Sequence, residues 1–387
     1  MVGTPTTGID DAADQERLAS LIIDLQSRGL KVETALEKRP GGAGPSDAGM
    51  IWVEGTAVTV PVDADFVTGT PYTLRADDDG GFGIYADGRR LADAAPADRP
   101  RYYDLTTDDG IPYWQLALLH LDSLASTVLQ TCAYWGNEDQ CHFCGIGLSL
   151  DSGHTVAVKR PNHLAEVAVA AKELDGAVDV TLTTGSTYGA DKGALYISKC
   201  GQAVKEASGL PVEVQFEPPD DLAVIDQVAD RGIDSVGIHI ETFDPKVLAR
   251  IAPPKYRTGI DRYFETWEYA VERFGEGQVS TYVILGMGED PDLIIEGCQR
   301  AADIGVYPFV VPLRPVPGSL LGDASPPPAD YVDRVARSVA PYLVARGLTA
   351  DKVSAGCARC QACSPVGALE QALKLGESRR LIPVRPV

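Results

Sequence analysis

Six of the eight cysteines in this 387-residue chain stand in two short clusters. The first cluster consists of Cys132, Cys141 and Cys144. The second consists of Cys357, Cys360 and Cys363. Gaps of two residues let neighbouring thiolates converge on one metal ion or cluster, and the longer gap of eight residues in the first trio lets its first cysteine return from a loop. This spacing indicates metal sites rather than disulfides.

Each trio supplies one thiol fewer than the four ligands that usually hold a structural zinc ion. His142 lies between two ligands of the first trio, where it is poorly placed to reach the same metal. Three thiolates on a four-iron cluster leave one iron open to a substrate or cofactor. For the first trio, zinc or a plain electron-transfer cluster remains an alternative. For the second trio, the alternative is a small zinc-stabilised tail. Cys200 and Cys298 lie in amphipathic patterns and are predicted to be core residues.

Short β-branched runs alternate with amphipathic helical patterns in the middle of the chain. The predicted strands are 127–131, 178–184, 211–217, 235–241, 279–285 and 307–313. The predicted helices between them are 162–174, 191–207, 221–232, 261–274 and 291–305. This alternation predicts an α/β fold, with six βα units on a parallel sheet that curls into a partial barrel. The first trio follows the first strand, at the carboxyl end where parallel α/β folds form their active sites.

The regions on either side of the barrel have different patterns. We expect an α+β accessory region at 1–125, the partial barrel at 126–325, and a cysteine-rich extension at 326–387. The accessory patterns predict helices at 15–29 and 113–125, short strands within 50–62, and a flexible loop at 41–49. The extension begins with a predicted helix at 331–347, which Pro341 is expected to kink or divide.

The formal net charge of −21 argues against nucleic acid or an anionic membrane as a partner. No apolar run approaches the roughly 18 residues of a membrane-spanning helix. The first residues lack the basic patch and apolar run of a signal peptide. The sequence therefore predicts a cytoplasmic protein, in a compartment where thiols stay reduced.

Cys132, Cys141, Phe143 and Cys144, placed after the first strand of a six-unit partial barrel, resemble the signature of the radical S-adenosylmethionine (SAM) superfamily. The usual first gap of that signature is shorter than the one in this chain. The resemblance implies that the three cysteines hold a [4Fe-4S] cluster whose fourth iron chelates the amine and carboxylate of SAM. Taken whole, the chain is most similar to the biotin-synthase-related radical SAM proteins of nitrilase gene clusters.

The same resemblance implies contacts for SAM along the later strands. The implied SAM-binding residues are Phe143, Thr183, Thr184, Gly185, Glu217, His239, Glu241, Lys255, Arg257 and Gly286. The candidate substrate contacts are Arg314 and Tyr282. A buried structural histidine remains the alternative for His239, and a surface salt bridge is the alternative for Lys255 and Arg257.

The resemblance implies an enzyme that cleaves SAM to a 5′-deoxyadenosyl radical and removes hydrogen from a small metabolite derived from a sugar, nucleoside or amino acid. The second trio implies an auxiliary Fe–S cluster, which is expected to give up sulfur for C–S bond formation. Rearrangement or dehydrogenation is the alternative, with the auxiliary cluster as electron acceptor or substrate anchor. A non-catalytic Fe–S or zinc protein is the other alternative. An external electron donor such as flavodoxin or ferredoxin is the expected partner.

Overall fold

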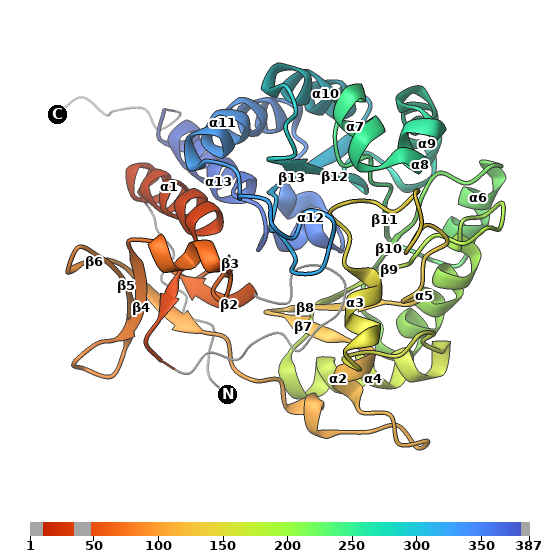
Figure 1. Cartoon of the computed structure of the whole chain (residues 1–387), viewed down its shortest axis with the longest axis horizontal. Coiled ribbons are helices and arrows are strands. Elements are labelled where there is room, and N and C mark those ends of the chain that lie inside the picture. The colour runs from red at the N-terminus through yellow and green to blue at the C-terminus, as the bar shows by residue number, and fades with distance from the viewer. Residues whose placement is uncertain (1–10, 35–47, 381–387) are drawn as a thin grey trace.

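The computed structural model describes residues 11–34 and 48–380, which form two β-sheets flanked by helices (Figure 1). The larger sheet has the order β13-β12-β11-β10-β9-β8-β7. Its strands are β7 (Leu118–His120), β8 (Ser123–Thr127), β9 (Asp179–Thr183), β10 (Val212–Gln215), β11 (Ser235–Gly237), β12 (Val279–Leu285) and β13 (Val306–Pro312). Strands β8 to β13 pair in parallel, whereas β7 pairs antiparallel with β8 at one edge. The predicted partial barrel of six βα units is therefore confirmed.

Helices connect these strands and cover the outside of the curled sheet (Figure 1). They are α3 (Ile146–Asp151), α4 (Pro161–Asp175), α5 (Ala194–Ser208), α6 (Ala223–Asp230), α7 (Pro245–Ile251), α8 (Pro253–Thr258), α9 (Ile260–Phe274), α10 (Pro291–Asp303) and α11 (Ala329–Arg346). The five helices predicted between the strands are all present. Helix α11 runs unbroken through Pro341, so the prediction that this proline divides it is wrong.

The smaller sheet belongs to the accessory region and has the order β1-β4-β5-β6-β2-β3. Its strands are β1 (Lys31–Val32), β2 (Ala48–Val53), β3 (Thr56–Pro61), β4 (Tyr72–Ala76), β5 (Phe82–Ala86) and β6 (Arg89–Pro96). The helical elements beside it are α1 (Ala12–Arg28), η1 (Asp65–Gly69), η2 (Arg101–Asp104) and α2 (Tyr113–Leu116). The loop predicted at 41–49 lies largely outside the described residues.

The predicted helix at 113–125 is wrong, because only its first turn is helical. The chain then forms β7 and β8, joined by a tight turn in which Leu121 has φ +60°. The first barrel strand is therefore Ser123–Thr127, four residues before the prediction of 127–131. Asp122 in that turn accepts hydrogen bonds from Arg359, more than 200 positions later in the chain. Contacts between residues so far apart in sequence cannot be predicted from local hydrophobic periodicity. The domain boundary predicted at residue 125 stays a prediction, although β7 joins the larger sheet before it.

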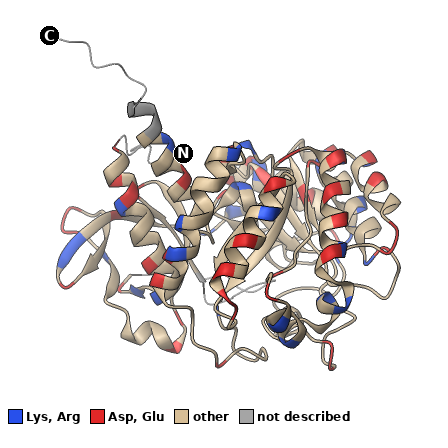
Figure 2. Ribbon diagram, turned by 90° about the horizontal axis from the view of Figure 1, so that it is seen from above, with Lys and Arg blue, Asp and Glu red and all other residues tan. Residues whose placement is uncertain are grey.

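The C-terminal extension packs back onto the other two regions. It contains η3 (Ala350–Lys352), α12 (Cys357–Cys360) and α13 (Val366–Arg380). Helix α13 contacts both α1 and α11, and the α12 segment lies between the barrel strands and β2–β3 of the accessory sheet (Figure 1). Acidic residues recur along the outer helices, as the net charge requires (Figure 2). None of the helices in the described ranges is long and apolar enough to cross a membrane.

Candidate active site

The first cysteine trio lies in a loop beyond the carboxyl end of β8. The loop is tied to the barrel by backbone hydrogen bonds from Ala133 to Ser186, just after β9, and from His142 to Ile251, at the end of α7. A turn brings the Cys144 N–H to the Cys141 carbonyl at 3.1 Å. His142 does not line the cavity that the three cysteines share, in agreement with the sequence analysis.

Two buried or half-buried carboxylates lie near this loop. Glu217 accepts a hydrogen bond from the Tyr134 hydroxyl at 3.2 Å. Glu241 pairs with the Lys255 ammonium at 3.0 Å, and its backbone is held at φ +73°, a strained conformation for a side-chain-bearing residue. Burial acts to lower the pKa of Lys255, but the surrounding acidic groups, Glu241 first among them, together raise that pKa well above its usual range. Lys255 is therefore a buried, charged partner of Glu241 and not the surface residue considered as an alternative.

One cavity of about 400 Å³ contains nearly all of the predicted site. The predicted residues that line it are Cys132, Cys141, Phe143, Cys144, Thr183, Thr184, Gly185, Glu217, His239, Glu241, Lys255, Tyr282, Arg314, Cys357, Cys360 and Cys363. Two predicted SAM contacts do not line it. Arg257 forms an ion pair with Asp139 on the surface, and the N–H of Gly286 binds the Glu289 carboxylate. Arg257 and Gly286 therefore contact residues next to the cavity and do not line the cavity itself.

The second trio approaches the cavity from the opposite end of the barrel. Gly356 donates its N–H to Asp179, the first residue of β9, and Ser235, the first residue of β11, binds the Ala355 carbonyl. Gln278, just before β12, binds the Lys352 carbonyl. These partners all lie at the amino ends of strands. The extension thus closes the bottom of the barrel and does not cover the open mouth at the carboxyl ends of the strands.

A buried ion network holds this closure in place. Arg359 binds Asp122, just before β8, at 2.7 Å and Asp179 at 2.8 Å. Gly356 has φ +96°, and a Cβ there would collide with the carboxylate of Glu213 in β10. Only glycine permits this close approach of the backbone. The network could not be found from sequence, because Arg359 lies 180 positions from Asp179 and 237 from Asp122.

The accessory sheet also contacts the second trio. The Thr59 hydroxyl in edge strand β3 lies 2.9 Å from the Cys363 sulfur, and the Thr59 N–H donates to the Ala362 carbonyl at 2.8 Å. Arg314, after β13, donates to the Thr59 carbonyl. The accessory region therefore forms part of the wall around the second trio.

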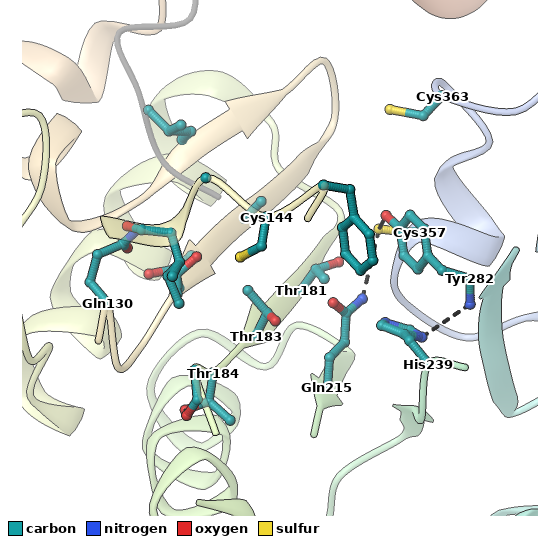
Figure 3. Close-up of a pocket in the computed structure, with 18 of the residues that line it drawn as sticks. Gln130, Cys144, Thr181, Thr183, Thr184, Gln215, His239, Tyr282, Cys357 and Cys363 are labelled. Carbon is teal, nitrogen blue, oxygen red and sulfur yellow. Dashed lines mark hydrogen bonds between the residues drawn. The ribbon is translucent and has the colours of Figure 1, made fainter. Parts of the chain in front are cut away.

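Polar side chains line the cavity between the two trios (Figure 3). The Tyr282 hydroxyl lies 2.9 Å from the Cys357 sulfur, and the Tyr282 N–H donates to Nδ1 of His239 at 3.2 Å. Burial, together with nearby Lys255, lowers the pKa of His239 well below its usual value. A neutral imidazole that accepts at Nδ1 carries its proton on Nε2. Nε2 has no partner among the described residues.

Three further unpaired polar atoms face the same cavity and were missed from sequence. They are Oγ1 of Thr127, Oε1 of Gln130 and Oγ1 of Thr181. Buried polar atoms are normally hydrogen-bonded, so this set points to a polar ligand. The alternation of side chains along β8 and β9 is the signal that would have found Thr127 and Thr181.

The first trio fits an iron–sulfur cluster in number, type and position. All six clustered cysteines are free thiols. Burial raises the pKa of Cys144 to about 11 and that of Cys141 well above its usual value, so their thiolates need a cation such as iron nearby. No three His, Cys, Asp or Glu residues in the described ranges converge on the position of a single metal ion. A cluster does not require such convergence, because its cysteines bind different irons.

The fold is a parallel half-barrel, and a cysteine trio lies beyond the carboxyl end of its first parallel strand. This arrangement is typical of α/β enzymes that bind a metal cluster. Residues 135–300 match the family model described as Radical SAM superfamily. The matched part of the chain is a radical SAM domain, and the protein is an enzyme. This excludes the alternative of a non-catalytic carrier. A radical SAM domain implies a [4Fe-4S] cluster and SAM, and the cysteines available for that cluster are Cys132, Cys141 and Cys144.

Sequence and structure comparisons identify proteins that are similar to this chain. A bacteriochlorophyllide c C-7(1)-hydroxylase from Chlorobaculum limnaeum is 31% identical over 137 residues, which is 35% of this chain and 34% of that protein. The alignment thus spans about a third of the relative's length. Methylornithine synthase is 15% identical with a TM-score of 0.45, covering 63% of this chain and 69% of its own. A radical SAM methyltransferase from Sphaerobacter thermophilus is 16% identical with a TM-score of 0.44, covering 80% and 83%.

Proposed function

We propose that this enzyme removes a hydrogen atom from a small metabolite and forms a C–S bond with sulfur from an auxiliary Fe–S cluster. The [4Fe-4S] cluster, reduced by an external donor, and SAM would supply the 5′-deoxyadenosyl radical that takes the hydrogen atom. The auxiliary cluster would supply the sulfide, with the C–S bond replacing an Fe–S bond and the electron passing to the cluster iron. Cys132, Cys141 and Cys144 hold that cluster, and Cys357, Cys360 and Cys363 hold the auxiliary one. The observation that carries the proposal is that the two trios line opposite ends of one cavity.

The residues at the carboxyl end of the barrel bind and orient SAM in this proposal. Thr183 ends β9, Thr184 and Gly185 follow it, and these residues accept hydrogen bonds from the methionine amine. Glu241, held by Lys255, retains a carboxylate oxygen for the ribose hydroxyls. Phe143 covers the adenine. Charge-assisted hydrogen bonds of this kind contribute about 1.5–3 kcal/mol each.

The substrate lies between the trios, against the polar wall that includes His239 and Gln215. The neighbouring strands β12 and β13 add the apolar residues Ile284, Phe309 and Val311 to the same cavity. A pocket of this kind excludes water and keeps the reacting carbon close to both ends. Tyr282 positions His239 and touches Cys357, so it couples the substrate wall to the second trio.

The second candidate is oxidation without sulfur insertion, with the auxiliary cluster as electron acceptor. The observation that favours it is the identity with a relative described as a hydroxylase, over a third of that relative's length. We further propose a flavodoxin or ferredoxin as electron donor and the cytoplasm as the site of action. Nucleic acid and membrane partners are not expected, given the net charge of −21.

Metal content tests the two-cluster part of the proposal. After anaerobic reconstitution we expect about eight iron and eight sulfide per chain. Replacing Cys357, Cys360 and Cys363 together by Ala should leave about four of each, while C200A, in the buried core, should leave about eight. Stoichiometric zinc without sulfide would contradict the proposal.

Isotope labelling tests whether the sulfur of the product comes from the auxiliary cluster. The protein is reconstituted with ³⁴S-sulfide and given a candidate metabolite, and the product is examined by mass spectrometry. Labelled product, at about one turnover per cluster without added sulfide, supports sulfur insertion. Sulfur-free product from many turnovers, with the auxiliary cluster intact by Mössbauer spectroscopy, favours oxidation or rearrangement.

A further inference from the structure

Lys159 is a buried lysine on the wall of the cavity, in the segment between α3 and α4. Its side chain is 2% exposed. The ammonium donates to the Thr127 carbonyl at 2.6 Å and to the Thr155 hydroxyl at 2.8 Å. Both partners are uncharged. An ammonium has three N–H donors, so one donor remains for a further partner.

Lysine is almost never fully buried unless an acid pairs with it. Burial alone lowers the pKa of Lys159 to about 7, and no carboxylate in the described ranges counteracts this effect. Of the other cations on the cavity wall, Lys255 pairs with Glu241, and Arg314, which donates to the Thr59 carbonyl, is only half-buried. Lys159 therefore stands out as a cation whose anionic partner is not part of the described protein.

The surroundings of Lys159 indicate what that partner is. Two of the unpaired polar atoms in the cavity belong to Thr127, whose carbonyl Lys159 already binds, and to Gln130, three residues further on. Leu116 and Ile146 add apolar surface to the same cavity. A single ammonium with neutral hydrogen-bonding groups matches a monovalent carboxylate, whereas a phosphate dianion generally requires more positive charge or several N–H groups.

We propose that Lys159 binds a carboxylate group of the substrate that occupies this cavity. The inference rests on the proposed function, in which the substrate lies between the two trios. It narrows the substrate class to a small carboxylic acid with an apolar portion. The methionine part of SAM also carries a carboxylate, so the test must separate these two sources.

The test uses the anaerobically reconstituted enzyme and calorimetry with octanoate and its uncharged analogue octanamide as probes. Wild type should bind octanoate at least tenfold more tightly than octanamide, because a charge-assisted hydrogen bond of ordinary strength gives about ten- to a hundredfold in affinity. K159M, which keeps the apolar stem, should lose this preference. K172M is the matched control, because Lys172 also donates to a backbone carbonyl but lies outside the cavity.

The SAM affinity of the same samples distinguishes a substrate carboxylate from the carboxylate of SAM as the partner of Lys159. K159M should bind SAM within about twofold of wild type, which also shows that the variant is folded. Loss of both SAM and octanoate binding in a folded K159Q variant, checked by circular dichroism, would assign the lysine to SAM and overturn the proposal. No octanoate preference in wild type, or a preference that survives in K159M, would also overturn it. Formation of 5′-deoxyadenosine is measured separately, so failure of the radical chemistry is distinguishable from failure at Lys159.

Discussion

The two cysteine trios face the same cavity but are positioned by different means. The first lies in one loop of 13 residues at the carboxyl ends of the strands, held by backbone hydrogen bonds to nearby barrel loops. The second lies at the amino ends and depends on Arg359, on Gly356 and on Thr59 from the accessory sheet. The carboxyl end is therefore a property of the barrel, whereas the amino end exists only when three regions of the chain come together.

This difference suggests that the two ends of the barrel have different roles in the reaction. The match to the family model begins just after Cys132 and includes Cys141 and Cys144 of the loop at the carboxyl end. The closure at the amino end lies outside the matched residues 135–300. We infer that the carboxyl end supplies the shared radical chemistry and that the amino end adapts it to a particular reaction.

The largest expected effect is on SAM cleavage, which should depend on the cysteines at the carboxyl end and not on those at the amino end. C144A should abolish formation of 5′-deoxyadenosine from SAM under dithionite, because it removes a cluster ligand at the carboxyl end. C360A should retain SAM cleavage, because its cysteine lies at the other end. Chromatography of the quenched reactions checks both. SAM cleavage by C144A at the wild-type rate would show that the ligand assignment is wrong.

Stability should respond differently at the two ends. R359Q leaves the fully buried Asp179 carboxylate with the Gly356 N–H but without its cationic partner, and breaking a buried ion pair costs about 3–5 kcal/mol of unfolding free energy. R257Q removes an ion pair at the carboxyl end whose arginine is 56% exposed, which should cost at most about 1 kcal/mol. Urea unfolding of the unloaded protein measures both. Equal losses would mean that the amino-end network is not the stronger anchor.

Between the two ends, Lys159 should give the stability of the protein a distinctive pH dependence. Its pKa is about 7 in the folded protein, against an unfolded value of about 10.4. Between these values the unfolded chain binds one more proton, so folded stability rises with pH and is lowest below pH 7. Relative to K159M, the unfolding free energy of wild type should rise by about 1.4 kcal/mol per pH unit from pH 7 to 9. A constant difference would contradict a buried, unpaired lysine.

The smallest expected effect concerns SAM recognition at the carboxyl end. E241Q keeps the shape of the side chain but loses the charge, so SAM affinity should fall by about tenfold. E217Q is the matched comparison, because Glu217 lines the same cavity and binds Tyr134. Calorimetry with SAM checks both variants. Full affinity in E241Q with a loss in E217Q would move the ribose contact to the other carboxylate.

Much of the barrel could be predicted from local patterns. Strand β12 matches its prediction at both ends, because the segment from Val279 to Leu285 is rich in β-branched residues and nearly all of it is buried, on both faces. The helices around it carry apolar residues at helical spacing. The helix predicted at 113–125 failed because Leu118, Leu119 and Leu124 suit a buried strand as well as a helix, and the turn at Leu121 is stabilised from elsewhere.

Residue type and spacing were sufficient to identify the six clustered cysteines as candidate metal ligands, the inward carboxylates and the parallel half-barrel. These features rest on local periodicity and on short-range ligand spacing, which the chain carries wherever it folds. The side of the barrel that the second trio closes, the pairing of Lys255 with Glu241 and the burial of Lys159 depend on contacts between distant segments. Such contacts are selected by the packing of the whole chain, because a buried charge is tolerable only where the folded neighbours supply its hydrogen bonds.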